Sequence, residues 1–398
     1  MLKYWIWLSA LHGIGAQAAL KLLAYFETPD KIFFASEEEL ENAGMGEKEL
    51  AALSDKSLDR TMEILDACAD KEITVITIND AVYPERLKNI FDPPIVLYIL
   101  GRMPAIDEEA AVAVAGTRSC TPYGLKNAER MGYELTRAGC LGVSGLAKGI
   151  DAAAAQGALR AGGRVIGVVG SGPDIIYPRE NTRLFEDVLK NGCIISEYPP
   201  GTEVRPSHFP QRNRILSGLS VGVLIVEAPQ KSGALITAAH ALEQGRDVFA
   251  LMANADAQSS YGSNKLIRDG AIPVMTGDDI AGEYTAIYPS RIHIGRKRLP
   301  LDKEGEKRLL KSQTEIPAKK GIDKPAAGDY DLKTAESALN DTEKTIVNVL
   351  KGGTLHLNDV IEKCALPAGS VMAALTMLEI KGVAIQEKGK FFKLKKRS

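Results

Sequence analysis

The sequence has few of the residues that cross-link a protein or hold a metal. Its five cysteines are odd in number, scattered along 398 residues and never spaced as C-x-x-C. This pattern argues against a disulfide framework and against a zinc site. We therefore expect no metal, and a reducing cytoplasm fits the cysteine usage best.

Long hydrophobic runs and an excess of one charge are missing too. The apolar start from Tyr4 to Leu11 faintly resembles a signal peptide, but no small-residue cleavage site follows it. No run approaches the roughly 18 apolar residues that a membrane span needs, so none is expected. The formal net charge is only −2, so a nucleic-acid partner would have to meet a local basic surface.

The motifs of nucleotide cofactors and of nucleotide hydrolysis are absent. A dinucleotide site needs G-x-G-x-x-G, whereas the chain reads GTRSCTPYG from Gly116 and GSGPD from Gly170. The segment GLAKG from Gly145 lacks the G-K-[ST] of a P-loop. Ser144 and Ser171 share no motif with a general base. We therefore expect no cofactor and no enzyme activity.

What the chain does contain is a series of similar turns. In each, a β-branched run ends in small residues and a helical pattern follows; the four segments are VAVAGTRSCTPYG, VSGLAKGID, VVGSGPDIIYP and VEAPQKSGALIT. If the strands are parallel, all the turns open at one edge of the sheet. Glycine lets a backbone approach there, and the helix offers unpaired N–H groups to an anion. Together the turns predict a long anion-binding groove.

Strands and helices alternate through the main body, from about residue 109 to residue 280. Strands are expected near 112–116, 140–145, 164–170, 192–197, 221–227, 247–253 and 272–275. Alternation of this kind predicts a parallel, doubly wound α/β sheet. Two shorter segments from Ile73 to Gly101 are expected to dock onto it.

Smaller parts flank this body. Residues 1–70 read as short helices with two glycine hairpins, LHGIG and NAGMG, which suit either a helix-hairpin-helix pair or a helical module that only packs or binds protein. We favour the second, because Glu47 stands where a phosphate would prefer a cation. The remaining boundaries are 71–285 for the sheet domain, 286–340 for a basic flexible linker, and 341–398 for three helices and a hairpin, which suggest a winged helix.

Cations and aromatic residues concentrate at the predicted edge. The densest stretch is SHFPQRNRILSG, where Phe209 is followed by Arg212 and Arg214. Single-stranded nucleic acid suits this combination, because arginines hold phosphates while an aromatic face stacks any base. The competing interpretation pairs the two arginines with Glu197 or Glu227 inside the domain. For one of the two arginines, internal pairing and DNA binding are equally favoured. For Phe209 and Arg118 we favour DNA binding in the groove.

These motifs together closely resemble the DprA (Smf) family of bacterial DNA-processing proteins. The resemblance rests on GTRSCTPYG, SGLAKGIDAAAAQGAL, GSGPDIIYPREN, SEYPPGT, HFPQRNRILSGLS, VEAPQKSGALITAAHALEQGRDVFA and GSNKLIRDGA, in that order. It implies an extended Rossmann-like fold, a helical N-terminal module of sterile-alpha-motif or helix-hairpin-helix type, and a C-terminal winged helix. It also implies a dimer, formed through the Rossmann domain, that protects single-stranded DNA during natural transformation and loads a RecA-type recombinase onto it.

The resemblance carries a set of DNA-binding residues onto this chain. They are Gly116, Thr117, Arg118, Ser144, Gly145, Lys148, Gly170, Ser171, Gly172, Arg179, Phe209, Arg212, Asn213, Arg214, Lys231, Ser232 and Gly233. The segment LMANADAQSSYGSN departs from the family's usual Pro-Gly, which puts the contribution of that loop in doubt. The expected recognition helix, Ser370 to Lys381, offers little to a base edge, although the basic tail could touch phosphate.

An enzyme is the alternative function. A phosphoribohydrolase of the lysine-decarboxylase-like family would use the same sheet edge on a nucleotide. It expects P-G-G-x-G-T-x-x-E after the strand that ends at Glu227, and this chain has Gln230, Lys231, Ser232 and Gly233 instead. The binding protein is therefore the favoured interpretation.

Overall fold

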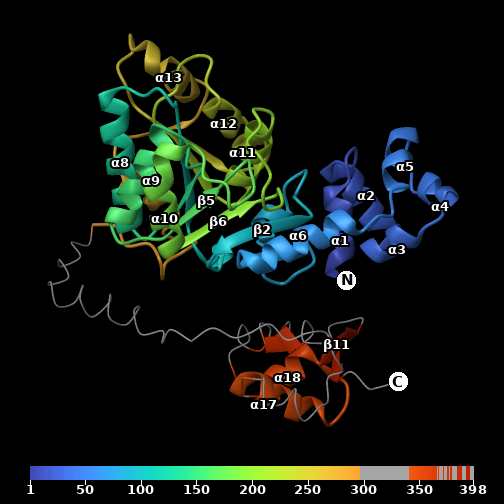
Figure 1. Cartoon of the computed structure of the whole chain (residues 1–398). Coiled ribbons are helices and arrows are strands. Elements are labelled where there is room, and N and C mark those ends of the chain that lie inside the picture. The colour runs from blue at the N-terminus through green and yellow to red at the C-terminus, as the bar shows by residue number, and fades with distance from the viewer. Residues whose placement is uncertain are drawn as a thin grey trace. The chain divides into compact units, whose positions relative to one another are not determined.

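The computed structural model describes residues 1–295 and 340–394, except for short gaps between 365 and 390. The chain forms two compact units, Met1–Pro300 and Leu301–Ser398 (Figure 1). No helix among the described residues is long and apolar enough to cross a membrane. The predicted linker lies outside the described residues from 296 to 339.

Within its described residues, the first unit is built on a nine-stranded sheet of order β1-β2-β6-β5-β4-β3-β7-β8-β9. The strands are β1 (Ile73–Thr77), β2 (Val96–Gly101), β3 (Ala111–Ala115), β4 (Leu141–Ser144), β5 (Val165–Val168), β6 (Gly192–Ser196), β7 (Gly222–Ile225), β8 (Asp247–Leu251) and β9 (Ile272–Val274). From β6 to β9 all neighbours are parallel, while β2 pairs antiparallel with β1 and β6. The predicted doubly wound, mostly parallel sheet is confirmed.

The apolar character of the strands explains why helices cover both faces. Every residue of β3 is buried, and its side chains alternate between two hydrophobic clusters. Val112 and Val114 pack with α8 (Pro122–Arg137) and α9 (Ile150–Arg160). Ala113 belongs to the cluster that contains α11 (His208–Gly218) and α12 (Ala234–Glu243). Strands buried on both faces are typical of parallel sheets, and they read as continuous apolar runs.

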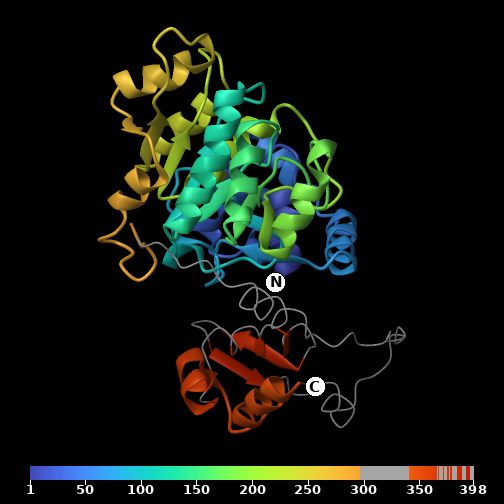
Figure 2. The same cartoon turned by 90° about the vertical axis from the view of Figure 1, so that its left-hand side faces the viewer.

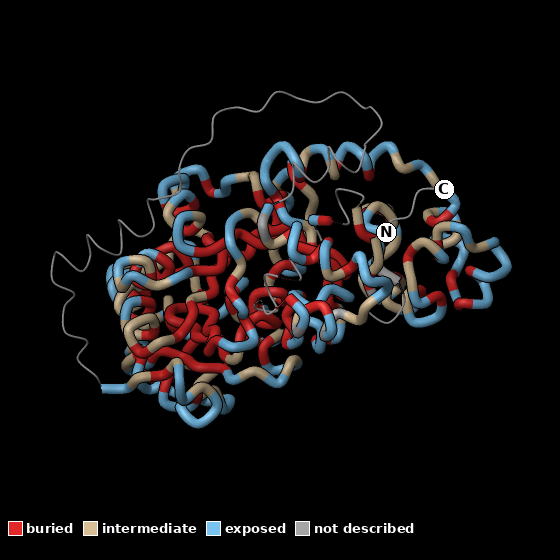
Figure 3. The backbone as a smooth tube through the Cα atoms, turned by 90° about the horizontal axis from the view of Figure 1, so that it is seen from below, coloured by how far each residue is buried: buried red, intermediate tan, exposed pale blue. Residues whose placement is uncertain are grey.

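Figure 2 shows α8 and α9 lying in front of the sheet. Figure 3 shows the buried residues, in red, concentrated in the interior of the sheet domain. Helix α10 (Thr182–Lys190) covers the same face as α9, with which it shares a cluster. Helices α13 (Tyr261–Arg268) and α14 (Gly277–Glu283) follow β8 and β9. The sheet thus lies between two helical layers. The predicted turns follow the carboxyl ends of β3, β4, β5 and β7.

The N-terminal helices continue the core of the sheet. They are α1 (Leu2–Ala10), α2 (Ala16–Phe26), α3 (Pro29–Phe34), α4 (Glu37–Asn42), α5 (Glu47–Leu53) and α6 (Asp59–Asp70). Their buried side chains, such as Trp5 and Leu22, belong to the cluster that includes Leu97 and Tyr98 of β2. The predicted helical module is confirmed, while its sterile-alpha-motif or helix-hairpin-helix type stays a prediction.

The second unit contains α17 (Asp341–Leu350), α18 (Leu357–Cys364) and the strands β10 (Leu355–His356), β11 (Ala384–Glu387) and β12 (Phe391–Leu394). These strands pair antiparallel in the order β10-β12-β11. Asn340 caps α17 in a capping box with Glu343. Most of the expected recognition helix, 370–381, and the basic tail after Leu394 lie outside the described residues.

Gly157 of α9 allows α8 and α9 to pack at close range, so their contact is sensitive to one added methyl group. A Cβ added at Gly157 would lie 1.9 Å from the carbonyl oxygen of Glu129. We expect Gly157→Ala to lower the free energy of unfolding by about 1–3 kcal/mol, because overpacking outweighs the helix propensity of alanine. Urea unfolding measures this change. Gly233→Ala is the control: a Cβ there meets nothing within 4 Å, so a similar loss in both variants would contradict the packing explanation.

Candidate functional site

The site lies where the winding direction of the sheet reverses. From β3 the chain proceeds outward through β4, β5 and β6, and it then returns to the other side of β3 as β7. Ligands of open α/β sheets bind at such a switch point, beyond the carboxyl ends of the strands. The N–H of Thr117 donates to the carbonyl of Glu227 at 2.8 Å and so joins the turns after β3 and β7.

The carboxylate of Glu227 occupies the start of α8. It is fully buried and accepts hydrogen bonds from the backbone N–H and the hydroxyl of Thr121, both at 2.9 Å. Thr121 itself caps the helix by accepting from Gly124. A carboxylate is stabilised by the positive end of a helix. Glu227 therefore stabilises the start of α8, and Arg118 is the cationic side chain of this turn.

An exposed cation lies directly over an aromatic ring at this edge. The Cζ atom of Arg118 lies 4.5 Å from the centroid of the Phe209 ring, a cation–π distance. On Phe209 the Tyr177 ring packs as well, with centroids 5.7 Å apart and planes tilted by 40°. Arg118 and Tyr177 are exposed and Phe209 is half-buried. The turns after β3 and β5 thus meet the first turn of α11 in one cation-aromatic cluster, which we define as Arg118, Tyr177 and Phe209.

A small pocket opens beside this cluster. It is lined by Gly145, Val169, Gly170, Ser171, Tyr177, Val204, Phe209 and Arg212. The glycines expose backbone to the pocket, and the two aromatic rings form part of its wall. The sequence motifs of the second and third turns therefore converge on one hollow with Phe209.

Arg212 holds this pocket together from inside. Its side chain is buried, and its Nη1 donates to the carbonyl of Gly145 at 2.8 Å and to the carbonyl of Val168. Burial lowers the pKa of the Arg212 guanidinium, and the nearby carboxylate of Asp151 opposes that shift. The Nε–H of Arg212 has no hydrogen-bond partner among the described residues. Arg212 thus joins the ends of β4 and β5 and leaves one buried donor at the pocket.

The prediction for Arg214 needs a correction. Its guanidinium is buried and pairs with the carboxylates of Asp92, at 3.1 Å, and Glu197, at 2.5 Å. Burial raises the pKa of the Glu197 carboxyl, and Arg214 acts against that shift. A guanidinium held by two carboxylates cannot line an open groove, so the internal ion pair that the sequence left open is the one that forms.

The other predicted residues divide by exposure. Exposed at the edge are Arg118, Lys148, Arg179, Lys231 and Gly233, while Gly116, Thr117, Asn213 and Ser232 are half-buried. Buried are Ser144, Gly145, Gly170, Ser171 and Gly172. Lys148 pairs with Glu180 at 2.5 Å, and the amide of Asn213 donates to the carbonyl of Gly233. DNA contacts by these residues stay a prediction.

Two structural residues at this edge escaped the sequence interpretation. Leu146 adopts a positive φ of 50° in the second turn, a strained conformation for a non-glycine residue. Asn181 donates to the carbonyl of Leu146 at 2.9 Å and so secures that turn. In the sequence, the only sign of this hydrogen bond is Asn181 itself, the asparagine of YPREN, which follows closely after the third turn.

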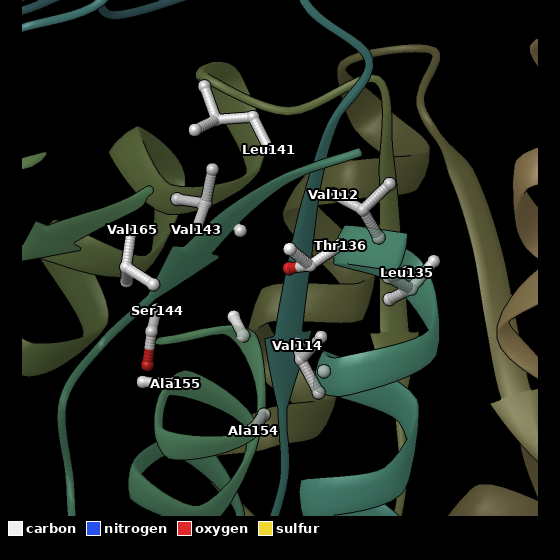
Figure 4. Close-up of a pocket in the computed structure, with 13 residues that line it drawn as sticks. Val112, Val114, Leu135, Thr136, Leu141, Val143, Ser144, Ala154, Ala155 and Val165 are labelled. Carbon is white, nitrogen blue, oxygen red and sulfur yellow. The ribbon is translucent and has the colours of Figure 1, made fainter. Parts of the chain in front are cut away.

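A further cavity lies deeper, between α8, α9 and the sheet (Figure 4). Its lining is mostly apolar and includes Val112, Val143 and Val165. The hydroxyl of Ser144, at its rim, already donates to the carbonyl of Asp151 at 3.0 Å. This cavity is a packing gap in the core rather than a second site.

The chain is similar to known proteins over almost its whole length. Residues 74–285 match the family profile described as DNA recombination-mediator protein A, and residues 331–390 match the DprA winged helix domain. The chain is 35% identical over 391 residues to protein Smf of Synechocystis, covering 97% of both chains. The chain belongs to the DprA (Smf) family. Its second unit is accordingly the winged helix that the sequence predicted.

Other members of the DprA family are similar over shorter parts of the chain. The DNA processing protein DprA of Bacillus subtilis is 42% identical over 220 residues, which cover 55% of this chain and 74% of that protein. The X-ray structure of DprA from Streptococcus pneumoniae superposes with a TM-score of 0.60 at 36% identity, covering 70% of this chain and 96% of that chain. The fold of the first unit is therefore the DprA fold.

Removal of Arg214 should expose how much the fold depends on the internal pairs. We expect Arg214→Met to destabilise the protein by about 3–5 kcal/mol, because Glu197 would be left as a buried, unpaired carboxylate. Without Arg214 the pKa of Glu197 rises further in the folded state only, so the loss should grow as the pH rises above the ordinary glutamate pKa, near about 4.3. Denaturant unfolding at pH 5 and pH 8 measures both effects.

Arg60→Met is the matched control for this prediction, because the Arg60–Glu63 pair is exposed and such pairs contribute about 0–1 kcal/mol. Equal stability losses in the two variants, or a loss for Arg214→Met that does not depend on pH, would contradict the role assigned to Arg214.

Proposed function

We propose that the protein binds single-stranded DNA along the edge of the sheet and passes it to a RecA-type recombinase. The observation that carries this proposal is the Arg118 guanidinium lying 4.5 Å from the centroid of the Phe209 ring, beside a pocket lined by the second and third turns. A cation next to an aromatic face serves the two chemically different parts of a nucleotide, its phosphate and its base.

Each part of the cluster has a task in this proposal. Phe209 and Tyr177 offer ring faces on which a base stacks without regard to its identity. Arg118 binds the neighbouring phosphate, and Lys148, Arg179 and Lys231 extend the positive surface along the edge. The unpaired Nε–H of Arg212 donates to an acceptor that enters the pocket. An open row of contacts of this kind suits a polymer better than a dinucleotide.

The family supports a proposed biological role. Its profile describes a recombination mediator, and a mediator must hold single-stranded DNA until a recombinase replaces it. We therefore propose that the protein acts in the cytoplasm, protects incoming DNA during natural transformation and loads a RecA-type recombinase onto it. We also propose that it works as a homodimer formed through the Rossmann-like domain.

Binding rather than catalysis is supported by the state of the polar groups at the edge. Glu227, the carboxylate that the phosphoribohydrolase alternative would use, is buried and committed to Thr121. Asp151 is buried beside Arg212, and burial raises the pKa of its carboxyl. These groups stabilise turns, so we propose that the protein has no enzymatic activity of its own.

Removal of either partner in the cation-aromatic pair should weaken DNA binding. We expect Arg118→Ala and Phe209→Ala each to lower the affinity for oligothymidylate by about 1–3 kcal/mol, roughly 5- to 150-fold. Arg118→Ala should also reduce the slope of log K against log salt by about 0.7, because one phosphate contact is lost. Fluorescence anisotropy at several salt concentrations measures both. Arg60→Ala, an exposed arginine of α6, is the control, and wild-type affinity in both groove variants would refute the groove.

Recombinase loading provides a separate test of the mediator role. On DNA coated with single-strand-binding protein, we expect the wild type to accelerate filament formation by a RecA-type recombinase and Phe209→Ala to fail, because handover requires the DNA to be held. Filament formation on uncoated DNA is the control for recombinase activity. If the wild type gave no acceleration on coated DNA, the protein would be a DNA-binding protein without a loading function.

A further inference from the structure

One large apolar side chain near the site is almost completely in solvent. Phe91 is 83% exposed, the highest value for a large hydrophobic side chain among the described residues. It stands in the loop between α7 (Glu85–Lys88) and β2. Aromatic side chains gain free energy by burial, so this ring offers a face that a bound partner would cover with a gain in free energy.

The loop that carries Phe91 is held in place on several sides. Asp92 pairs with Arg214 at 3.1 Å, and the hydroxyl of Tyr83 donates to the carbonyl of Pro94 at 2.7 Å. Gln17, in the first turn of α2, donates to the carbonyl of Phe91 itself. Pro93 and Pro94 are buried. The backbone is thus fixed while the ring projects outward.

A row of side chains on α11 runs between Phe209 and this loop. His208, Gln211 and Arg214 recur every three residues and so lie along one side of α11. The His208 ring stacks on Tyr198 with centroids 4.0 Å apart and planes 12° from parallel, and the Tyr198 hydroxyl donates to Gln211 at 2.6 Å.

The row ends at Phe91, because Arg214 binds Asp92, the next residue in the chain. Arg214 follows Phe209 by five residues, which corresponds to a rise of about 7.5 Å along the helix. The loop that carries Phe91 is therefore offset from Phe209 along α11, and Gln17 joins its backbone to the N-terminal helix α2.

The chemistry at Phe91 repeats that of the groove. Lys88 precedes Phe91 by three residues, is exposed, and forms no ion pair with any residue that the structure describes. The carboxylates of Asp92 and Glu197, between Phe91 and Phe209, both pair with Arg214, which offsets part of their negative charge. A DNA strand that follows this row would meet a second aromatic face, that of Phe91, and a second cation, that of Lys88.

We propose that Phe91 is a second base-stacking position for the same strand of DNA, with Lys88 as its phosphate contact. The strand would leave the Phe209 pocket along Tyr198 and run toward the N-terminal helices. This inference rests on the proposed function, since it extends the groove that Phe209 begins. It gives the strand a direction across β5, β6 and β2.

A length series of oligothymidylates tests the proposal. The full chain is used throughout. On the shortest oligonucleotide that the wild type binds, Phe91→Ala should have the same affinity as the wild type. It should bind longer ones at least about fivefold more weakly, as expected for the loss of one stacked base. Phe91→Trp should restore the affinity for long oligonucleotides, because it restores the stacking face. Lys88→Ala should lower the salt slope by about 0.7, again only for the longer ones.

Phe34→Ala is the matched control, because Phe34 of α3 is also a strongly exposed phenylalanine, at 73%, and lies outside the row. Equal affinity of Phe91→Ala and wild type at every length would overturn the proposal, and so would an equal loss in Phe34→Ala. Wild-type DNA binding combined with impaired recombinase loading would assign Phe91 to a protein contact instead.

Phe209→Ala separates this inference from the function on which it rests. If Phe209→Ala weakens binding at all lengths while Phe91→Ala weakens none, the groove stands and its extension fails. If neither variant weakens binding, the proposed function itself fails.

Discussion

The buried guanidinium of Arg212 is the contact on which the candidate site depends. It joins the carbonyls of Gly145 and Val168, at the ends of β4 and β5, from the same helix that presents Phe209. Backbone carbonyls at strand ends need partners once they are buried, and a guanidinium can serve two of them from one planar group. The position of the Phe209 ring and the shape of the pocket therefore both depend on the helix that carries Arg212.

Burial of carboxylates gives this edge its positive character. The chain as a whole carries a formal net charge of −2, yet Glu227 and Asp151 are buried and Glu197 is half-buried, each beside a helix start or an arginine. Arg118, Arg179 and Lys231 remain exposed at the edge and form no ion pair with a described residue, while Lys148 pairs with Glu180. The local potential is thus decided by which charges are buried, rather than by how many the sequence contains.

Much of the fold could be predicted because it follows from local patterns. The run AVAVA at β3 and the turn signals after each strand specify a parallel sheet, and the observed strands lie within a few residues of those expected. The cation-aromatic composition at the strand ends likewise indicated Arg118 and Phe209, whose side chains do meet. The burial of Arg214 could not be decided this way, because Asp92 and Glu197 approach it from segments 122 and 17 residues away along the chain.

The sequence by itself determined the order of strands and helices, the small-residue turns at one edge and the membership of the family, since each depends on residues near one another in the chain. Only the tertiary structure decided which polar side chains face solvent. It buried Arg212 and Arg214, assigned Glu227 to the start of α8 and left Phe91 exposed at the end of the row along α11. The physical reason is that burial and charge pairing depend on distances between elements, and the packing of the whole sheet sets those distances.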